Sequence, residues 1–242
     1  MKKARAIFTI IEDGHQYFKI WYKYYTQFFD EEDIYVLIFG KNDSVDKLNC
    51  NTRHFPSLNC FEVEKGNKIG NQFKRELLNK YQYVVYADYD EIIFYPDGLG
   101  KYLDSLTADY VTCVGYEIVH RRFLERDFDF TQPILDQRSY WYHEPFMNKT
   151  LITKIDINWR PGKHYLEDRS PIFDGRLKLI HFHKLDYKFV TKLNEKNLLN
   201  LRVPAEDGSY NLFVGKEFES WWNQGEVQST KIYPTIKNSG AF

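Results

Sequence analysis

The sequence lacks the signatures of several common classes of enzyme. It contains no Gly-x4-Gly-Lys-Ser/Thr loop, no Gly-x-Gly-x-x-Gly after its first apolar run, no Gly-x-Ser-x-Gly and no His-Glu-x-x-His. Such motifs supply phosphate-binding amides, a nucleophilic serine or a zinc site. Their absence argues against the common nucleotide hydrolases, dehydrogenases, esterases and zinc proteases.

Cysteines are few, and long apolar runs are missing. Cys50, Cys60 and Cys113 are odd in number and lack metal-type spacing, so we expect reduced thiols in a cytoplasmic protein. The apolar run behind the basic N-terminus stops at Glu12 and Asp13, which makes it too short for an export signal. No later run approaches the roughly 20 residues of a membrane span. We therefore expect no transmembrane segment and leave peripheral membrane association open.

An excess of charge of either sign is also missing. The 242 residues include 33 basic and 34 acidic ones, for a net charge of −1, so bulk electrostatics favour neither nucleic acid nor an anionic membrane as partner. Aromatic residues are abundant instead, with 19 Tyr, 19 Phe and 5 Trp. Many of them must form the core, and tyrosines in such numbers also suit a site that stacks on sugars.

Strand-like and helix-like segments alternate along the first half of the chain, which indicates an α/β protein. The order strand, helix, strand at the start predicts a parallel βαβ unit. The expected strands cover 4–11, 34–39, 60–63, 83–87, 110–114, 151–157 and 176–182, the expected helices 16–29, 69–81 and 189–199, and the expected loop 51–59. We expect 83–87 to be a central parallel strand, whereas 121–138 has no clear period.

The most informative stretch is 83–91, an apolar run that ends in three carboxylates. A buried strand does not carry Asp88, Asp90 and Glu91 without compensation. Because residues i and i+2 of an extended chain point to one side, Asp88 and Asp90 can reach one divalent cation at the strand's carboxyl end, where α/β sheets bind ligands. Glu91 faces the other way and is expected to be structural. A second Asp-x-Asp, at 127–129, follows no strand and is expected to be a solvated loop.

A pair of histidines near the end of a later strand is the second feature of interest. His181 and His183 alternate with apolar neighbours, so both project from one face. They are either partly buried histidines satisfied by the backbone or by Asp186, or metal ligands. Aspartate oxygens, an imidazole nitrogen and phosphate or water oxygens would suit Mn²⁺ or Mg²⁺ rather than structural zinc.

Basic residues gather in the segment between these two features. Lys149, Arg160, Lys163 and His164 can neutralise a departing diphosphate, because phosphoryl oxygens require charged donors in a preformed pocket. The alternative for each of them is a solvated loop residue.

Taken together, these stretches resemble glycosyltransferases of the GT-A fold, in particular the family 2-like and family 92-like group. The matching features are the first strand with its acidic turn and the following helix bearing Trp21, the second strand ending in Asn42-Asp43-Ser44, Asp88-Tyr89-Asp90-Glu91, the segment 149–164 and Ile180-His181-Phe182-His183-Lys184. The resemblance spans residues 4–190. It implies a Rossmann-like, mostly parallel sheet flanked by helices in a catalytic domain at 1–200. A less regular extension, 201–242, is expected to pack on the same domain.

The resemblance also implies a site. Asp88 and Asp90 would hold a divalent cation on the diphosphate of a nucleotide-sugar, and His181 would complete its coordination. The end of the first strand would contact the nucleoside, although it lacks the Arg-x-Glu often found there. The expected metal ligands are Asp88, Asp90, His181 and His183, and the expected donor-binding residues are Thr9, Glu12, Asp43, Asp88, Lys149 and His164.

The reaction expected from this site is metal-dependent transfer of a sugar, from a UDP-sugar, to a glycan or lipid-linked acceptor. We expect it to invert configuration, which requires a base for the acceptor hydroxyl. Glu144 and Asp174 are the candidates, and the aromatic setting of Glu144 can raise a carboxyl pKa and stack a sugar. A retaining reaction would need no such base.

Two alternatives share this fold. A sugar-phosphate nucleotidyltransferase would carry a Gly-rich, basic loop after the first strand, which residues 12–15 do not resemble. A non-catalytic sugar-binding module would not need to keep Asp88 and Asp90.

Overall fold

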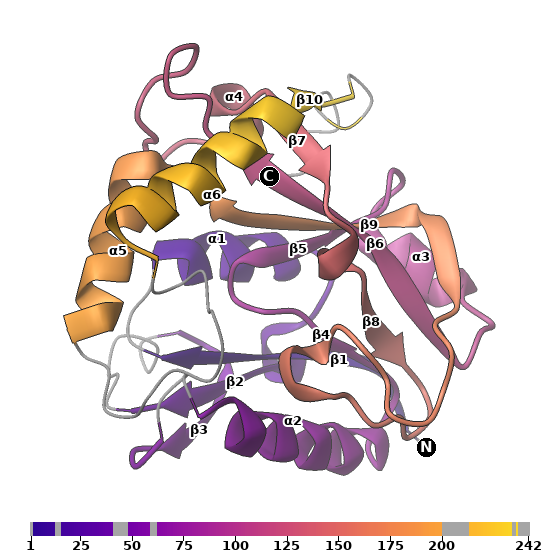
Figure 1. Cartoon of the computed structure of the whole chain (residues 1–242). Helices are drawn as coiled ribbons and strands as arrows, with labels where there is room; N and C mark the ends of the chain where they lie inside the picture. The colour runs from indigo at the N-terminus through magenta and orange to yellow at the C-terminus, as the bar shows by residue number, and fades with distance from the viewer. Residues whose placement is uncertain are drawn as a thin grey trace.

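A computed structural model describes residues 2–12, 16–40, 48–58, 62–199, 213–233 and 236. Asp43 and Cys60 lie outside the described residues. Within them, a 10-stranded mixed sheet forms the centre of the molecule and helices cover it (Figure 1). The mixed α/β architecture expected from the sequence is confirmed.

The chain begins with a strand and a helix and ends, in its described part, with two helices and a short strand. In chain order, the elements are β1 (Lys3–Glu12), α1 (Gln16–Tyr25), η1 (Glu31–Asp33), β2 (Ile34–Phe39), β3 (Asn51–Phe55), α2 (Val63–Leu78), β4 (Tyr81–Tyr86), β5 (Glu91–Phe94), α3 (Leu99–Ser105), β6 (Tyr110–Val119), α4 (Ile134–Gln137), β7 (Tyr140–His143), η2 (Pro145–Met147), β8 (Lys149–Thr153), η3 (Pro161–Lys163), β9 (Phe173–Lys184), α5 (Tyr187–Leu199), α6 (Gly215–Gln228) and β10 (Thr230–Lys231).

The sheet has a parallel half and a mostly antiparallel half. Its strand order is β10-β7-β6-β8-β4-β1-β2-β3, and β9 pairs with both β5 and β6. Strands β4, β1, β2 and β3 run parallel, whereas β8 is antiparallel to both of its neighbours. The expectation of a mostly parallel sheet therefore holds for the first half. In the second half β9 runs parallel to β6, which precedes it by a long connection. The other pairs there, including β9 with β5, are antiparallel. Strand β4 is an interior strand, as expected.

Helix α1 ties the first βαβ unit to the short strand β5. Its aromatic residues recur at helical spacing and are buried against the sheet. The Tyr24 hydroxyl donates to the carbonyl of Ile93 at 2.8 Å, and the Tyr25 hydroxyl accepts from the Ile93 amide at 2.9 Å. Helix α2 lies on the opposite face of the parallel half (Figure 1). The chain that follows β4 is thus held by packing from α1.

The segment 51–63 differs from expectation. The expected loop contains edge strand β3, whose exposed polar side chains conceal its backbone pairing with β2. The expected strand at 60–63 falls partly outside the described residues, and helix α2 begins at Val63. A Cβ at Gly66 would lie 3.3 Å from the Phe39 ring, so glycine on the buried face allows a close approach and weakens the apolar period.

The described part of the C-terminal segment packs on the same body as the rest of the chain. Trp222 is fully buried, clusters with Val119, Tyr142 and Val190, and donates through its indole to the carbonyl of His120 at 3.2 Å. Helix α6 lies beside α5 (Figure 1). None of the helices in the described ranges has the length and apolar character needed to cross a membrane. Cys113 is a buried free thiol.

Candidate functional site

Asp88 and Asp90 lie in the tight turn between β4 and β5 rather than on a strand, and Glu91 begins β5. Strand β4 ends at Tyr86 and β5 begins at Glu91. The Glu91 amide donates to the carbonyl of Asp88 at 2.9 Å, and the Asp88 amide donates to the Glu91 carboxylate at 3.0 Å. Asp88 and Asp90 therefore do not follow strand alternation, and their side chains enter two neighbouring clusters instead of one shared site.

The first cluster, which we call the histidine–aspartate cluster, consists of Asp90, His181 and His183. One ligand atom from each residue lies within 4.8 Å of the others. The nearest pairs join Oδ2 of Asp90 to Nε2 of His181 at 3.2 Å and to Nδ1 of His183 at 3.4 Å. The two imidazole rings are stacked, with centroids 5.8 Å apart, since β9 projects both from one face. The Phe182 amide donates to the carbonyl of Asp90 at 3.0 Å and holds the turn on β9.

Glu117 extends this cluster on the far side of His181. It lies on β6 in register with His181 on β9, and it is 4% exposed. One carboxylate oxygen is hydrogen-bonded to Nδ1 of His181, and the other accepts the Lys184 amide at 3.0 Å. Glu117 was not among the expected site residues, because the strand expected at 110–114 extends to Val119. A single acidic residue within the apolar run 114–119 was the available signal.

The charges in the cluster stabilise one another. Burial alone would raise the pKa of Asp90, but His181 and His183 outweigh it and hold that pKa well below its usual value. Burial alone would lower the pKa of His181, but Glu117 and Asp90 outweigh it and raise that pKa well above its usual value. The raised pKa favours the imidazolium form of His181, between two carboxylates. A metal ion binding here must displace a proton.

The donor atoms of this cluster fit a divalent cation. One carboxylate oxygen and two imidazole nitrogens are ligands for first-row transition ions, and the carboxylate also suits Mg²⁺. Ligand bonds of about 2.1 Å at right angles place neighbouring donor atoms about 3 Å apart. The observed separations of 3.2 and 3.4 Å are close to this spacing.

The second cluster, the lysine–carboxylate cluster, consists of Asp88, Glu91, Lys149 and Lys163. The Lys149 ammonium lies 2.7 Å from Asp88 and 2.6 Å from Glu91, which is fully buried. Lys163 approaches Asp88 at 4.0 Å, and the Tyr86 hydroxyl also donates to this carboxylate. Burial opposes ionisation of Asp88, but Lys149 and Lys163 outweigh burial and lower its pKa to about 2. Glu91 is bound within the fold by Lys149.

The loop before His164 has an unusual backbone. Gly162 has φ of 74° and Lys163 has φ of 62°, so two successive residues are left-handed and only one is glycine. The Lys163 ammonium lies 4.2 Å above the Tyr86 ring. Burial, followed by the charge of Lys149, lowers the pKa of His164 to about 3, so its imidazole is neutral. A strained non-glycine residue at a cluster of charges is typical of functional sites.

Helix α2 holds this loop in place through Trp159. The Trp159 carbonyl accepts from the side-chain amides of Asn67 at 2.7 Å and Asn71 at 2.9 Å. The Trp159 indole donates to the carbonyl of Thr150 at 2.6 Å, so the loop is also fixed to β8. These hydrogen bonds hold the loop that carries Lys163 and His164.

Helix α6 covers the outer side of the histidine pair. The ring of Trp221 lies 5.9 Å from that of His183, measured between centroids. The Lys184 ammonium lies 3.9 Å from the Trp221 ring and donates to the Trp221 carbonyl at 2.9 Å. Burial lowers the pKa of Lys184 to about 8. Of the two tryptophans, Trp222 is core and Trp221 borders the cluster.

The remaining candidate residues lie at varying distances from the two clusters. Thr9 is fully buried in β1, and its hydroxyl has no hydrogen-bond partner among the described residues. Glu12 ends β1 beside Gly40. Glu144 begins the turn into η2, and its carboxylate accepts the Phe146 amide at 3.2 Å.

Asp174 is not brought to the clusters. It is bound by Arg176 at 2.7 Å and by the Tyr102 hydroxyl at 3.1 Å. His181 follows it by seven positions on the same strand, which corresponds to roughly 23 Å along an extended chain.

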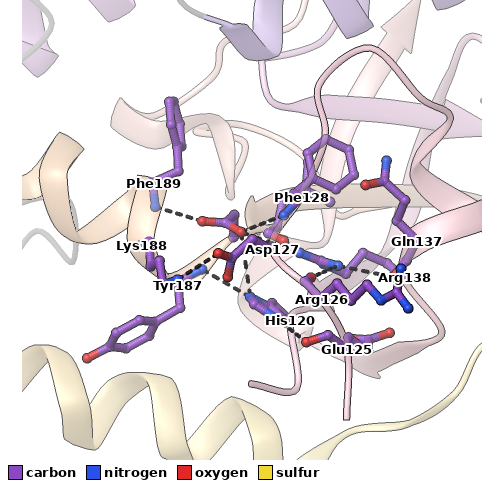
Figure 2. A network of polar contacts seen from close by, with 12 residues as sticks. His120, Glu125, Arg126, Asp127, Phe128, Gln137, Arg138, Tyr187, Lys188 and Phe189 are labelled. Carbon is purple, nitrogen blue, oxygen red and sulfur yellow. Dashed lines mark hydrogen bonds and ion pairs between the residues drawn. The ribbon is translucent and has the colours of Figure 1, made fainter. Parts of the chain in front are cut away.

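A separate polar network includes His120, Phe128, Arg138 and Phe189 (Figure 2). All four contact Asp186, which follows His183 by three positions. The Asp186 carboxylate accepts the amides of Phe128 and Phe189, each at 2.8 Å. It also lies 3.8 Å from Nδ1 of His120 and 3.6 Å from the Arg138 guanidinium. This network fixes the irregular 121–138 segment to the start of α5.

The second Asp-x-Asp lies at the edge of the Asp186 network. Asp127 and Asp129 are both exposed, and Asp127 pairs with Lys188 at 2.6 Å. The expected solvated loop is confirmed.

Comparisons with known proteins give no family assignment. No family model and no curated protein match the sequence. Among solved structures, the fold is similar to that of TarS from S. aureus, with 12% identity, a TM-score of 0.38, and coverage of 85% of this chain and 41% of that chain. A structure of TarS 1–349 in complex with UDP has 13% identity, a TM-score of 0.31, and coverage of 88% and 70%. The chain spans less than half the length of the first of these. Similarity at this level does not assign an activity.

Proposed function

We propose that this chain is a metal-dependent glycosyltransferase that uses a nucleotide-sugar donor, expected to be a UDP-sugar. The observation that supports this most strongly is the position of two clusters on one turn, at the carboxyl end of central strand β4. Asp90 joins a set of metal-type ligands, and Asp88 joins a pair of lysines. A cation site beside positive side chains is what an anionic diphosphate requires.

The histidine–aspartate cluster would hold Mn²⁺ or Mg²⁺. Asp90, His181 and His183 supply the ligands, and the bound ion would contribute positive charge at the diphosphate oxygens. Asp88 was expected to share this role, but its oxygens are bonded to Lys149 and Tyr86. We therefore place Asp88 on the donor side of the site.

The lysine–carboxylate cluster and His164 would contact the donor. Lys149 neutralises Asp88 and Glu91, which would otherwise repel a diphosphate. Lys163, at 4.0 Å from Asp88, is less tightly bound and can turn toward phosphate oxygens. His164 is neutral and can donate or accept a hydrogen bond without adding charge.

Of the two expected bases, Asp174 is bound to Arg176 away from the clusters, so we retain Glu144 as the candidate. In an inverting transfer, the acceptor oxygen bonds to the anomeric carbon, the bond from that carbon to the diphosphate oxygen breaks, and the diphosphate leaves with the electron pair. Glu144 would take the acceptor proton. The exposed rings of Phe146 (71%) and Tyr165 (60%) adjoin Glu144 and His164 in sequence and offer a surface for a glycan or lipid-linked saccharide. We assign catalysis to residues 1–200 and treat 201–242 as an extension of that domain.

The experiment is release of nucleotide from a panel of nucleotide-sugars with Mn²⁺, with and without saccharide acceptors. We expect release from one donor class, faster with acceptor and absent in Asp90→Asn. Asp174→Asn serves as the matched control and should retain the rate. Conversion of a nucleotide-sugar and added pyrophosphate to a nucleoside triphosphate and a sugar phosphate would indicate a nucleotidyltransferase. Binding without turnover for every donor would indicate a sugar-binding module.

A further inference from the structure

Glu117 is a buried carboxylate, and each of its two oxygens makes a hydrogen bond. Strand β6 places Glu117 directly opposite His181 of β9, so the two side chains are neighbours on adjacent strands. One oxygen accepts the Lys184 amide at 3.0 Å. The other is hydrogen-bonded to Nδ1 of His181. Both oxygens are thereby committed, and the carboxylate has a single orientation.

This arrangement determines which nitrogen of His181 can bind a cation. An ionised carboxylate only accepts hydrogen bonds, so Nδ1 of His181 must carry a proton. Its Nε2 then faces Oδ2 of Asp90, at 3.2 Å. A neutral imidazole held in this way presents its lone pair on Nε2 to the position shared with Asp90.

We infer that Glu117 is the positioning residue of the metal site, which holds His181 in the tautomer and orientation that bind a cation through Nε2. The inference rests on the proposed function only in taking Asp90, His181 and His183 as the ligands. A carboxylate behind a ligating histidine raises its basicity and fixes its ring, and loss of such a partner typically costs about 10–100-fold in metal affinity.

Substitution of Glu117 by glutamine makes this role testable. A glutamine side chain has one acceptor oxygen and one NH₂ donor. If the oxygen keeps the Lys184 amide, the NH₂ group faces Nδ1 of His181 and requires it to accept. The proton of a neutral His181 then moves to Nε2, which blocks the ligand position. Glu117→Gln therefore preserves size while inverting the tautomer.

The chain offers a matched control in Asp186→Asn. Asp186 is also buried, accepts backbone amides and lies beside a histidine, His120, but it belongs to the separate network of Figure 2. A general loss of packing would affect both variants alike. Only Glu117→Gln should affect metal binding.

The test uses Mn²⁺ alone with the full chain and measures free Mn²⁺ by electron paramagnetic resonance. We expect Glu117→Gln to bind about 10–100-fold more weakly than the parent chain, and Asp186→Asn to bind like the parent. Equal affinity of Glu117→Gln and the parent, or an equal loss in both variants, would overturn the inference.

Nitrogen NMR of the Zn²⁺-loaded parent chain supplies an independent readout that does not require the variant to fold. We expect His181 to keep its proton on Nδ1 and to bind the ion through Nε2; coordination through Nδ1 would overturn the inference.

If the parent binds metal in this way but no nucleotide-sugar binds or reacts, the proposed function fails and the inference stands. If the parent binds no metal at all, the inference fails, whereas nucleotide-sugar turnover without metal would preserve the transferase.

Discussion

The Nε2 atom of His181 lies 3.2 Å from Oδ2 of Asp90, although one residue comes from the late strand β9 and the other from the turn after β4. His183 contacts the same oxygen at 3.4 Å. Three ligand atoms from two distant segments of the chain thus surround one position. Only tertiary packing produces this arrangement.

The two imidazoles in this cluster predict a preference among metals. Imidazole nitrogen suits transition ions, whereas Mg²⁺ and Ca²⁺ prefer oxygen ligands. We expect Mn²⁺ to bind at least about tenfold more tightly than Mg²⁺ in competition titrations, and His183→Ala to remove most of that preference. His120→Ala, which removes a buried histidine outside the cluster, should leave it intact. Tighter binding of Mg²⁺ by the parent chain would contradict the assigned ligands.

The Lys149 ion pairs predict a large loss of stability on substitution. Lys149→Met leaves Glu91 and Asp88 beside an apolar group, and Glu91 is fully buried. Breaking a buried pair on one side costs about 3–5 kcal/mol of unfolding free energy, which urea denaturation measures. Lys154→Met is the control, because its pair with Asp109 is partly exposed and worth about 1 kcal/mol or less. Similar losses in the two variants would show that the buried ion pairs of Lys149 stabilise the fold no more than the partly exposed pair of Lys154.

The left-handed turn at Gly162 predicts a specific effect of one methyl group. An added Cβ would lie 2.8 Å from Cδ2 of His164, and the residue has φ of 74°. We expect Gly162→Ala to cost about 1 kcal/mol or more in unfolding free energy and to weaken donor binding, because Lys163 and His164 must move. Gly175→Ala, where an added Cβ meets nothing within 4 Å, should be neutral. Unchanged donor affinity in Gly162→Ala would remove this loop from the site.

His164 predicts a pH-dependent contribution to stability. Burial and the charge of Lys149 lower its pKa to about 3 in the folded chain, from 6.5. Between these values the unfolded chain binds the extra proton, so this contribution is complete above pH 6.5 and is lost as pH falls toward 3. The unfolding free energy of the parent should decline more steeply than that of His164→Gln, by up to about 1.4 kcal/mol per pH unit. Parallel slopes below pH 6.5 would mean that His164 is not held neutral.

The features predicted correctly from sequence were those with a regular period or a clear contrast. The apolar runs of β1, β2 and β4 and the aromatic spacing of α1 were sufficient, because side-chain burial follows the period of the element. The acidic turn after β4 was found because it contrasts with the apolar strand before it.

The features missed were those that depend on partners distant in the chain. Strand β3 is held by backbone pairing at an edge, so its side chains carry no apolar period. Glu117 became visible only when β6 was seen to continue beside β9. The separation of Asp174 from the clusters reflects its place at the opposite end of a long strand. None of these relationships is encoded in local spacing.

The most direct test of the account is thermal unfolding of the parent chain and of Asp90→Asn with a panel of nucleotide-sugars, with and without Mn²⁺. We predict that at least one nucleotide-sugar raises the melting temperature of the parent only when Mn²⁺ is present, and that Asp90→Asn shows no such rise while remaining folded. The absence of metal-dependent stabilisation by any nucleotide-sugar, or an unchanged rise in Asp90→Asn, would contradict a metal-dependent glycosyltransferase site centred on Asp90.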